Sequence, residues 1–128
     1  DFRFGAEDLK EAFHLVRLLE RAGYDGPLHF DAHPYRNENE AGVWEFARGC
    51  IRTYTALAER ARHFDSLPEV QEALVAAGTP ELGEASAAGL DEADALKAQA
   101  GDLDRLAERG YHNEALDQLV VDVLLGLR

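Results

Sequence analysis

The segment Leu28-His29-Phe30-Asp31-Ala32 decides the fold class expected for the first half of the chain. It follows the turn residues Tyr24-Asp25-Gly26-Pro27 and alternates apolar with polar side chains, which is the pattern of a short β-strand. The stretches on either side of it, residues 6–22 and 41–64, carry apolar residues at three- and four-residue spacing and predict amphipathic helices. Helix, strand and helix in succession are typical of an α/β fold with a parallel sheet. Since one strand cannot form a sheet, we expect the chain to be part of a larger protein.

The second half of the chain predicts helices without strands. A short helix is expected after Pro68, which suits the first turn of a helix, and a longer one over residues 113–126. Residues 76–101 are rich in Ala, Gly, Ser and acidic side chains, and they predict a mixture of loop and short helices. The apolar stripes of this half exceed what it can cover by itself, so we expect them to face a partner surface.

The composition excludes several classes of partner. The 128 residues include 25 acidic and 13 basic side chains, a formal net charge of −12, which argues against binding to nucleic acid or to an anionic membrane surface. No apolar run approaches the ~20 residues of a membrane span, and no signal peptide opens the chain. The single cysteine, Cys50, allows no internal disulfide and is expected to be a buried, inert thiol. The chain starts at Asp1, before the strand-like Phe2-Arg3-Phe4, and contains no Met, so we expect further sequence upstream.

Three polar residues at the end of the predicted strand are candidates for chemistry. His29, Asp31 and His33 are spaced two apart, so they would point to one face of a strand. Imidazole and carboxylate groups are suitable ligands for divalent cations, and α/β barrels place their active sites at the carboxyl ends of strands. The alternative is that these residues only begin a solvated loop. Asp1, taken alone, is similarly an exposed terminal acid.

Five segments of the chain form a recognisable series. They are Asp1-Phe2-Arg3-Phe4-Gly5, Gly23 through His33, Gly42-Val43-Trp44 through Arg52-Thr53-Tyr54, Pro68 through Leu74, and Leu116 through Leu119 with Leu124 through Arg128. The first resembles the end of the motif Asp-Gln-Asp-hydrophobic-Arg-Phe-Gly of the D-xylose isomerase family, and the second resembles the final barrel strand of that family. Together the five segments resemble the C-terminal third of the family's chain, and the resemblance is weakest between Gly78 and Gly101.

The resemblance implies a fold and an activity. Residues 1–64 would be the last βα units of a (β/α)8 TIM barrel, and residues 65–128 an extended α-helical C-terminal arm that supports oligomerisation into a homotetramer. The family interconverts D-xylose and D-xylulose, and also D-glucose and D-fructose, by a metal-assisted intramolecular hydride shift. An aldose or ketose sugar as substrate and a cytoplasmic location are implied in the same way.

The resemblance also implies a metal site. The family holds two divalent cations per subunit, Mg2+, Mn2+ or Co2+. By motif, Asp31 matches a carboxylate ligand of the first cation and Asp1 a ligand of the second, whereas His33 receives no role. The catalytic residues of the family match no position in this chain and are expected upstream of Asp1. The 128-residue chain alone is therefore expected to be inactive.

Two other functions stay open as alternatives. Another metal-dependent sugar isomerase or epimerase can use the same barrel, because a fold does not determine its substrate. A non-catalytic helical assembly module would keep only the oligomerisation role of the C-terminal half. The reading frame upstream of Asp1 distinguishes the three hypotheses, since further βα units with a His, a Lys and two Glu at strand ends favour the isomerase.

Overall fold

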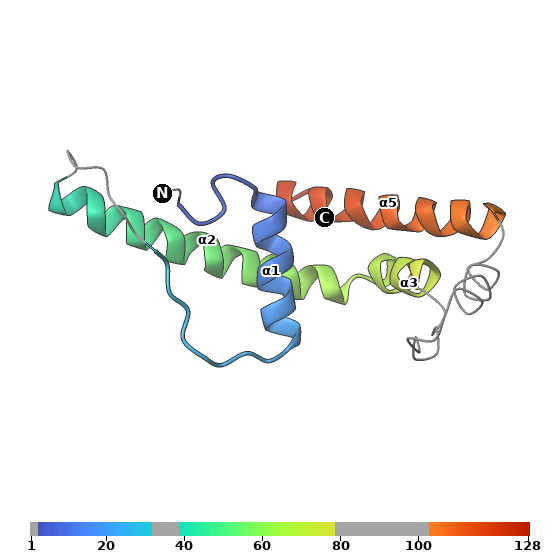
Figure 1. Cartoon of the computed structure of the whole chain (residues 1–128), viewed down its shortest axis with the longest axis horizontal. Helices are drawn as coiled ribbons and strands as arrows, with labels where there is room; N and C mark the ends of the chain where they lie inside the picture. Colours follow the sequence, from blue (N-terminus) through green and yellow to red (C-terminus); the bar gives the residue numbers. More distant parts are fainter. Residues whose placement is uncertain (1–2, 32–38, 79–102) are drawn as a thin grey trace, which may run out of the picture. The chain divides into compact units, whose positions relative to one another are not determined.

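The computed structural model describes residues 3–31, 39–78 and 103–128, and within these ranges it contains four helices and no strand. The helices, shown in Figure 1, are α1 (Leu9–Arg21), α2 (Glu40–Ser66), α3 (Pro68–Ala77) and α5 (Leu103–Leu125). The chain divides into two compact units, unit 1 with Asp1–Leu67 and Val120–Arg128, and unit 2 with Pro68–Leu119. Unit 1 holds α1 and α2, unit 2 holds α3, and the division falls within α5.

The predicted β-strand is wrong. Residues 28–31 form no strand, Arg3 and Phe4 form none either, and Ala32 lies outside the described residues. An extended segment becomes a strand only when a neighbouring strand shares its backbone hydrogen bonds. The alternation of apolar and polar residues indicates which side chains share a face, but it supplies no such neighbour. The expected fold class, an α/β fold forming the C-terminal part of a (β/α)8 TIM barrel, is therefore overturned by the all-helical architecture of the described residues.

The predicted helices of the first half are confirmed, and side chains at their ends explain where they begin and stop. α1 begins after Asp8, whose Oδ1 accepts a hydrogen bond from the backbone N–H of Glu11 at 2.9 Å. It ends before Gly23, whose φ of +60° lies in the left-handed region that favours glycine. α2 begins after Asn39, whose side-chain oxygen accepts from the N–H of Gly42 at 3.0 Å. Capping residues thus set the ends that periodicity alone leaves open.

The core of unit 1 lies where α1 crosses α2 (Figure 1). The rings of Phe13 on α1 and Phe64 on α2 meet edge to face with their centroids 5.6 Å apart, and both side chains are fully buried. Arg17 stacks over Phe64 at 4.9 Å, and its Nε donates to Oδ1 of Asp65 at 2.8 Å. Further buried side chains of the unit are Ala12, Val16, Phe46, Cys50, Leu57, Ala58, Ala61, Val120 and Val123. The apolar stripe of each helix is therefore what holds unit 1 together.

α5 is longer than the sequence pattern predicts. It begins at Leu103 rather than at residue 113 and passes through Gly110. The helix tolerates this residue because a glycine in a helix interior costs only about 1 kcal/mol. α3 forms as predicted from Pro68 and buries Val70 and Ala73. The mixture of loop and short helices predicted for residues 76–101 lies largely outside the described residues.

The predicted division at residue 64, with 65–128 as an oligomerisation arm, stays a prediction. Compactness divides the chain elsewhere, after Leu67 and again within α5. A division by compactness does not test a division by function. Among the helices that the structure describes, none is both long enough and apolar enough to cross a membrane.

Candidate functional site

A cavity of about 570 Å³ in unit 1 brings together separate parts of the chain. Its walls come from residues 3–5, the start of α1, residues 29–31, and Cys50 of α2. The charged and imidazole side chains in its lining are Arg3, Glu7, Asp8, Glu11, His29 and Asp31. Because carboxylates outnumber the one guanidinium, the lining is acidic and favours a cationic ligand.

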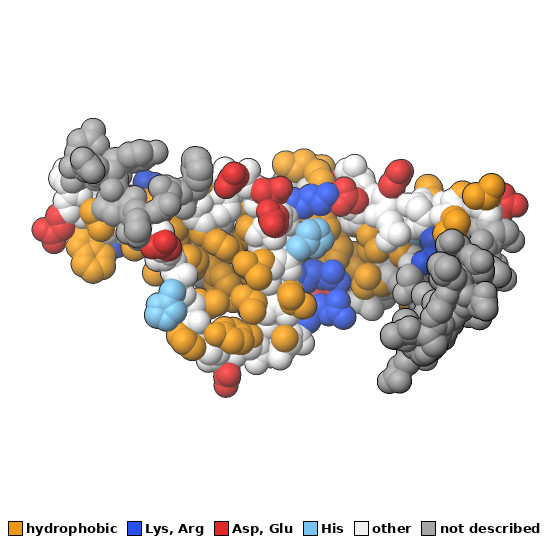
Figure 2. Space-filling model, viewed as in Figure 1, with side chains coloured by type: hydrophobic (Ala, Val, Ile, Leu, Met, Phe, Trp, Pro, Cys, Tyr) orange, Lys and Arg blue, Asp and Glu red, His pale blue; other side chains and the backbone are white. Residues whose placement is uncertain are grey.

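Hydrophobic side chains gather on the surface of unit 1 between α1 and the segment that leads to Asp31 (Figure 2). The exposed hydrophobic side chains of these two elements include Leu15 and Leu18 of α1, which are 50% and 66% exposed, and Tyr24 and Leu28 of the following segment, which are 49% and 42% exposed. Of these, Leu15 also lines the cavity. Large exposed apolar patches mark sites where other protein, a membrane or a ligand binds. Unit 1 therefore presents an apolar face next to an acidic cavity.

The predicted site residues have different outcomes. Asp31 and His29 both line the cavity, but Phe30 between them does so too, so the alternation of faces expected for a strand is not what places them there. Asp1 and His33 lie outside the described residues. In the described parts of the chain, no group of three or more His, Cys, Asp or Glu side chains is placed to hold a metal ion. The assignment of Asp1 and Asp31 as metal ligands stays a prediction.

The cavity offers the types of ligand atom that bind a divalent cation. Carboxylate oxygens bind Mg2+ and Mn2+, imidazole nitrogens bind transition metals, and Asp31 and His29 offer both donors in one cavity. Such a cation requires more ligands than these two, because Mg2+ is octahedral. A complete site therefore needs donors beyond those the described residues gather.

Residues 3–5 are fastened to α2 at two points. The backbone N–H of Phe4 donates to Sγ of Cys50 at 3.4 Å, and the predicted burial of this cysteine is confirmed. Gly5 has a φ of +80°, and a Cβ at this position would lie 3.1 Å from Cγ2 of Thr53. Both the backbone conformation and the close approach to α2 therefore favour glycine at this position.

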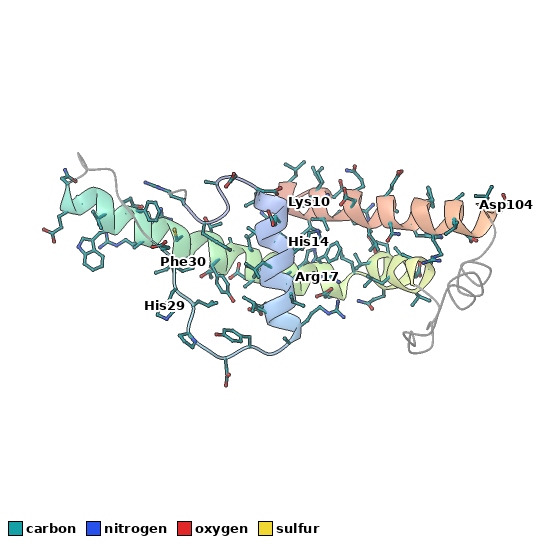
Figure 3. All side chains as sticks on the ribbon, in the orientation of Figure 1. Lys10, His14, Arg17, His29, Phe30 and Asp104 are labelled. Carbon is teal, nitrogen blue, oxygen red and sulfur yellow. The ribbon has the colours of Figure 1, made fainter. Side chains whose placement is uncertain are left out.

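Three half-buried rings join residues 3–5 and residues 28–31 on α2. The ring centroid of Phe30 lies 5.5 Å from that of Phe4 and 6.4 Å from that of Tyr54, and Phe4 and Tyr54 are 6.2 Å apart. These distances are typical of attractive aromatic pairs. In Figure 3, Phe30 lies against α2, whereas His29 points away from that helix. Burial raises the pKa of Tyr54, and the negative charge of Glu20 raises it further, so the phenol is neutral at physiological pH.

Two features of this site are absent from the sequence-based expectations. Glu7, Asp8 and Glu11 belong, by sequence, to the polar start of a helix and carry no sign that they share a cavity with Asp31. Phe4 and Phe30 carry a clearer sign, since each is a large apolar residue in a short segment of its own. A ring in such a segment needs a partner from another part of the chain.

No protein-family model matches the chain. Comparison with curated proteins relates the chain to the isomerases, because the relatives that match it belong to this class of enzyme. They carry the name xylose isomerase. The protein of Thermus caldophilus is 52% identical over 134 aligned residues, that of Thermus thermophilus is 51% identical over 131, and that of Streptomyces lividans is 52% identical over 131.

Each of these alignments covers 100% of this chain but only 33% or 34% of the relative. The chain is therefore related over its whole length to the xylose isomerases, and the resemblance predicted from its five segments is confirmed. It spans about a third of the length of the curated relatives it matches. This share is consistent with the C-terminal portion that the order of its motifs indicates.

Proposed function

We propose that this chain supplies the C-terminal third of a cytoplasmic xylose isomerase, which interconverts D-xylose and D-xylulose, and also D-glucose and D-fructose. The reaction is a metal-assisted intramolecular hydride shift. The observation that carries the proposal is the identity of 51–52% along the whole chain with relatives named xylose isomerase. The acidic cavity that Asp31 lines supports a reaction that depends on divalent cations.

Asp31 is the proposed ligand of the first cation, and Asp1 the proposed ligand of the second. The cations would be Mg2+, Mn2+ or Co2+ and would act as Lewis acids toward the oxygens of the sugar. The remaining ligands and the catalytic residues would come from the part of the protein that the longer relatives contain. Asp31 itself contributes a fixed negative charge, which lowers the free energy of a cation in the cavity.

The exposed apolar face of unit 1 also supports the proposal that this chain is one part of a longer protein. Leu15, Leu18 and Leu28 are between 42% and 66% exposed, which costs about 25 cal/mol for each Å² of apolar surface left in water. The relatives are about three times as long as this chain. We propose that the additional part of the protein covers this face and completes the cavity beside it.

The first prediction of this proposal concerns activity. The isolated 128-residue chain is expected to form no D-xylulose from D-xylose with Mg2+, whereas the full-length protein is expected to form it, because the catalytic residues lie outside this chain. A coupled assay of xylulose formation, with a metal-only blank, measures both. D-xylulose formed by the isolated chain would show that the catalytic residues lie within these 128 residues, contrary to the proposal. An inactive full-length protein would favour the helical assembly module, and activity only on other sugars would favour a different isomerase or epimerase.

The second prediction concerns assembly. Leu103 and Leu106 on α5 are 82% and 44% exposed, and they lie three residues apart on one side of the helix. We propose that such residues contact a neighbouring subunit in a homotetramer. Replacing both with Asp is expected to give smaller oligomers, because each change places a charge in an apolar contact. Size-exclusion chromatography with light scattering measures the mass.

The control for the assembly prediction is Asn113→Asp, which adds a charge at an exposed polar position of the same helix. This variant is expected to keep the native mass. An unchanged mass for the Leu103/Leu106 double variant would refute a role for this part of α5 in assembly.

A further inference from the structure

Residues 28–31 bring Asp31 to the cavity without a helix or a sheet to hold them. Among the described residues, the ring of Phe30 makes two of the contacts that hold this segment, with Phe4 and with Tyr54. Phe30 directly precedes Asp31 in the chain. Fixing the ring of Phe30 restricts the backbone from which the carboxylate of Asp31 extends.

Both partners of Phe30 are attached to α2. Tyr54 is part of this helix, which spans 27 residues and packs on α1 through a fully buried core. Phe4 is attached to the same helix by the hydrogen bond from its N–H to Sγ of Cys50. Its neighbour Arg3 lies with its guanidinium 5.7 Å from the ring of Phe46, also on α2. The helix is thus a fixed support for two segments that have no regular structure of their own.

We propose that Phe4, Phe30 and Tyr54 form a ring clamp that holds residues 28–31 in the position from which Asp31 serves as a cation ligand. This inference rests on the proposed role of Asp31. Tyr54 is a positioning residue in it, since its effect on the cation passes through Phe30 and the backbone. Groups that orient a metal ligand without touching the metal commonly change metal affinity 10–100-fold.

The test uses the full-length protein and Mn2+ binding measured by titration calorimetry. Tyr54→Leu removes one ring of the clamp and is expected to weaken Mn2+ binding about tenfold, at the low end of the effect of groups around a metal site. It is also expected to shift the visible absorption bands of bound Co2+, because these bands report ligand geometry. Tyr54→Phe keeps the ring and is expected to preserve both measurements.

Phe4→Leu removes the other partner of Phe30 and is expected to have the same two effects. A folding failure of one variant therefore leaves the other to decide. If both variants fold and bind Mn2+ with wild-type affinity, the ring clamp is overturned.

Phe64→Leu is the matched control for general destabilisation. Phe64 lies on the same helix as Tyr54, but its ring pairs with Phe13, whereas the ring of Tyr54 pairs with Phe30. Because Phe64 is 1% exposed and Tyr54 is only half-buried, the control is expected to lower the melting temperature more than Tyr54→Leu does. It is nevertheless expected to leave Mn2+ affinity unchanged, and an equal loss of affinity would overturn the clamp.

Asp31→Asn, measured beside these variants, separates the clamp from the function on which it rests. Loss of Mn2+ binding in Asp31→Asn together with wild-type binding in Tyr54→Leu would overturn the clamp and leave the role of Asp31 standing. Wild-type binding in Asp31→Asn would overturn both.

Discussion

Replacing Asp31 with Asn in the full-length protein is expected to abolish most xylose turnover and to weaken binding of the first divalent cation. The change preserves the shape of the side chain but removes a negative charge from an acidic cavity. A cation ligand contributes more than its neighbours, so the loss of affinity should exceed the roughly 10–100-fold that outer groups contribute. Calorimetric titration with Mn2+ and an assay of xylulose formation measure the two effects.

Glu11→Gln is the matched control for Asp31→Asn. Glu11 is also an acidic residue in the lining of the cavity, but it belongs to the first turn of α1 and has no proposed ligand role. Its replacement changes the net charge of the cavity by the same amount and is expected to leave turnover and the stoichiometry of Mn2+ binding intact. Equal losses in the two variants would mean that total charge, rather than a ligand at Asp31, governs cation binding.

Replacing Phe64 with Ala is expected to lower the free energy of unfolding by about 3–5 kcal/mol, the usual cost of removing a buried aromatic ring. Phe64 is 1% exposed, meets Phe13 edge to face, and carries Arg17 over its ring. The variant would leave a cavity at the crossing of α1 and α2 and would remove both ring contacts. Since whole domains are stable by only about 5–15 kcal/mol, the loss should be visible as a large fall in the urea midpoint of unfolding.

Trp44→Ala on the same helix tests whether burial is the cause. Trp44 is 56% exposed, and its Nε1 donates to Oε1 of Glu40 at 3.4 Å. A surface change of this kind usually costs within about 0.5 kcal/mol. If Trp44→Ala destabilised the protein as much as Phe64→Ala, the ring pair of Phe13 and Phe64 would not be the centre of the core.

The positions of α1, α2 and α3 follow from local features of the sequence. Apolar residues at helical spacing give each helix one side to bury, and this pattern depends only on neighbours a few residues away. α1 begins after Asp8, which caps its first turn, and it ends before Gly23, which adopts a left-handed backbone conformation. Pro68 begins α3 because its fixed φ suits a first turn. The early start of α5 escaped prediction because the pattern before residue 113 is weak and Gly110 is tolerated inside the helix.

The resemblance to xylose isomerases was also readable from the sequence alone, since it depends on the identity and order of residues rather than on their positions in space. Alignments that span the whole chain confirm it. Sequence reasoning chose His29, Asp31 and His33 as one polar face of a strand, and the structure places His29 and Asp31, with Phe30 between them, in the lining of one cavity. Because these residues form no strand, their shared place in the lining is set by the tertiary structure and not by their spacing.

Only the tertiary structure decided what residues 28–31 become and what surrounds Asp31. A strand requires a partner from elsewhere, and no local alternation of side chains can supply one, so the predicted strand was wrong. The cavity joins Arg3, Glu11 and Asp31, which belong to three separate segments and approach one another only in the folded chain. The contacts of Phe30 with Phe4 and Tyr54 also form only in the folded chain. A ring is stabilised by packing against another ring, whatever the distance between the two along the chain.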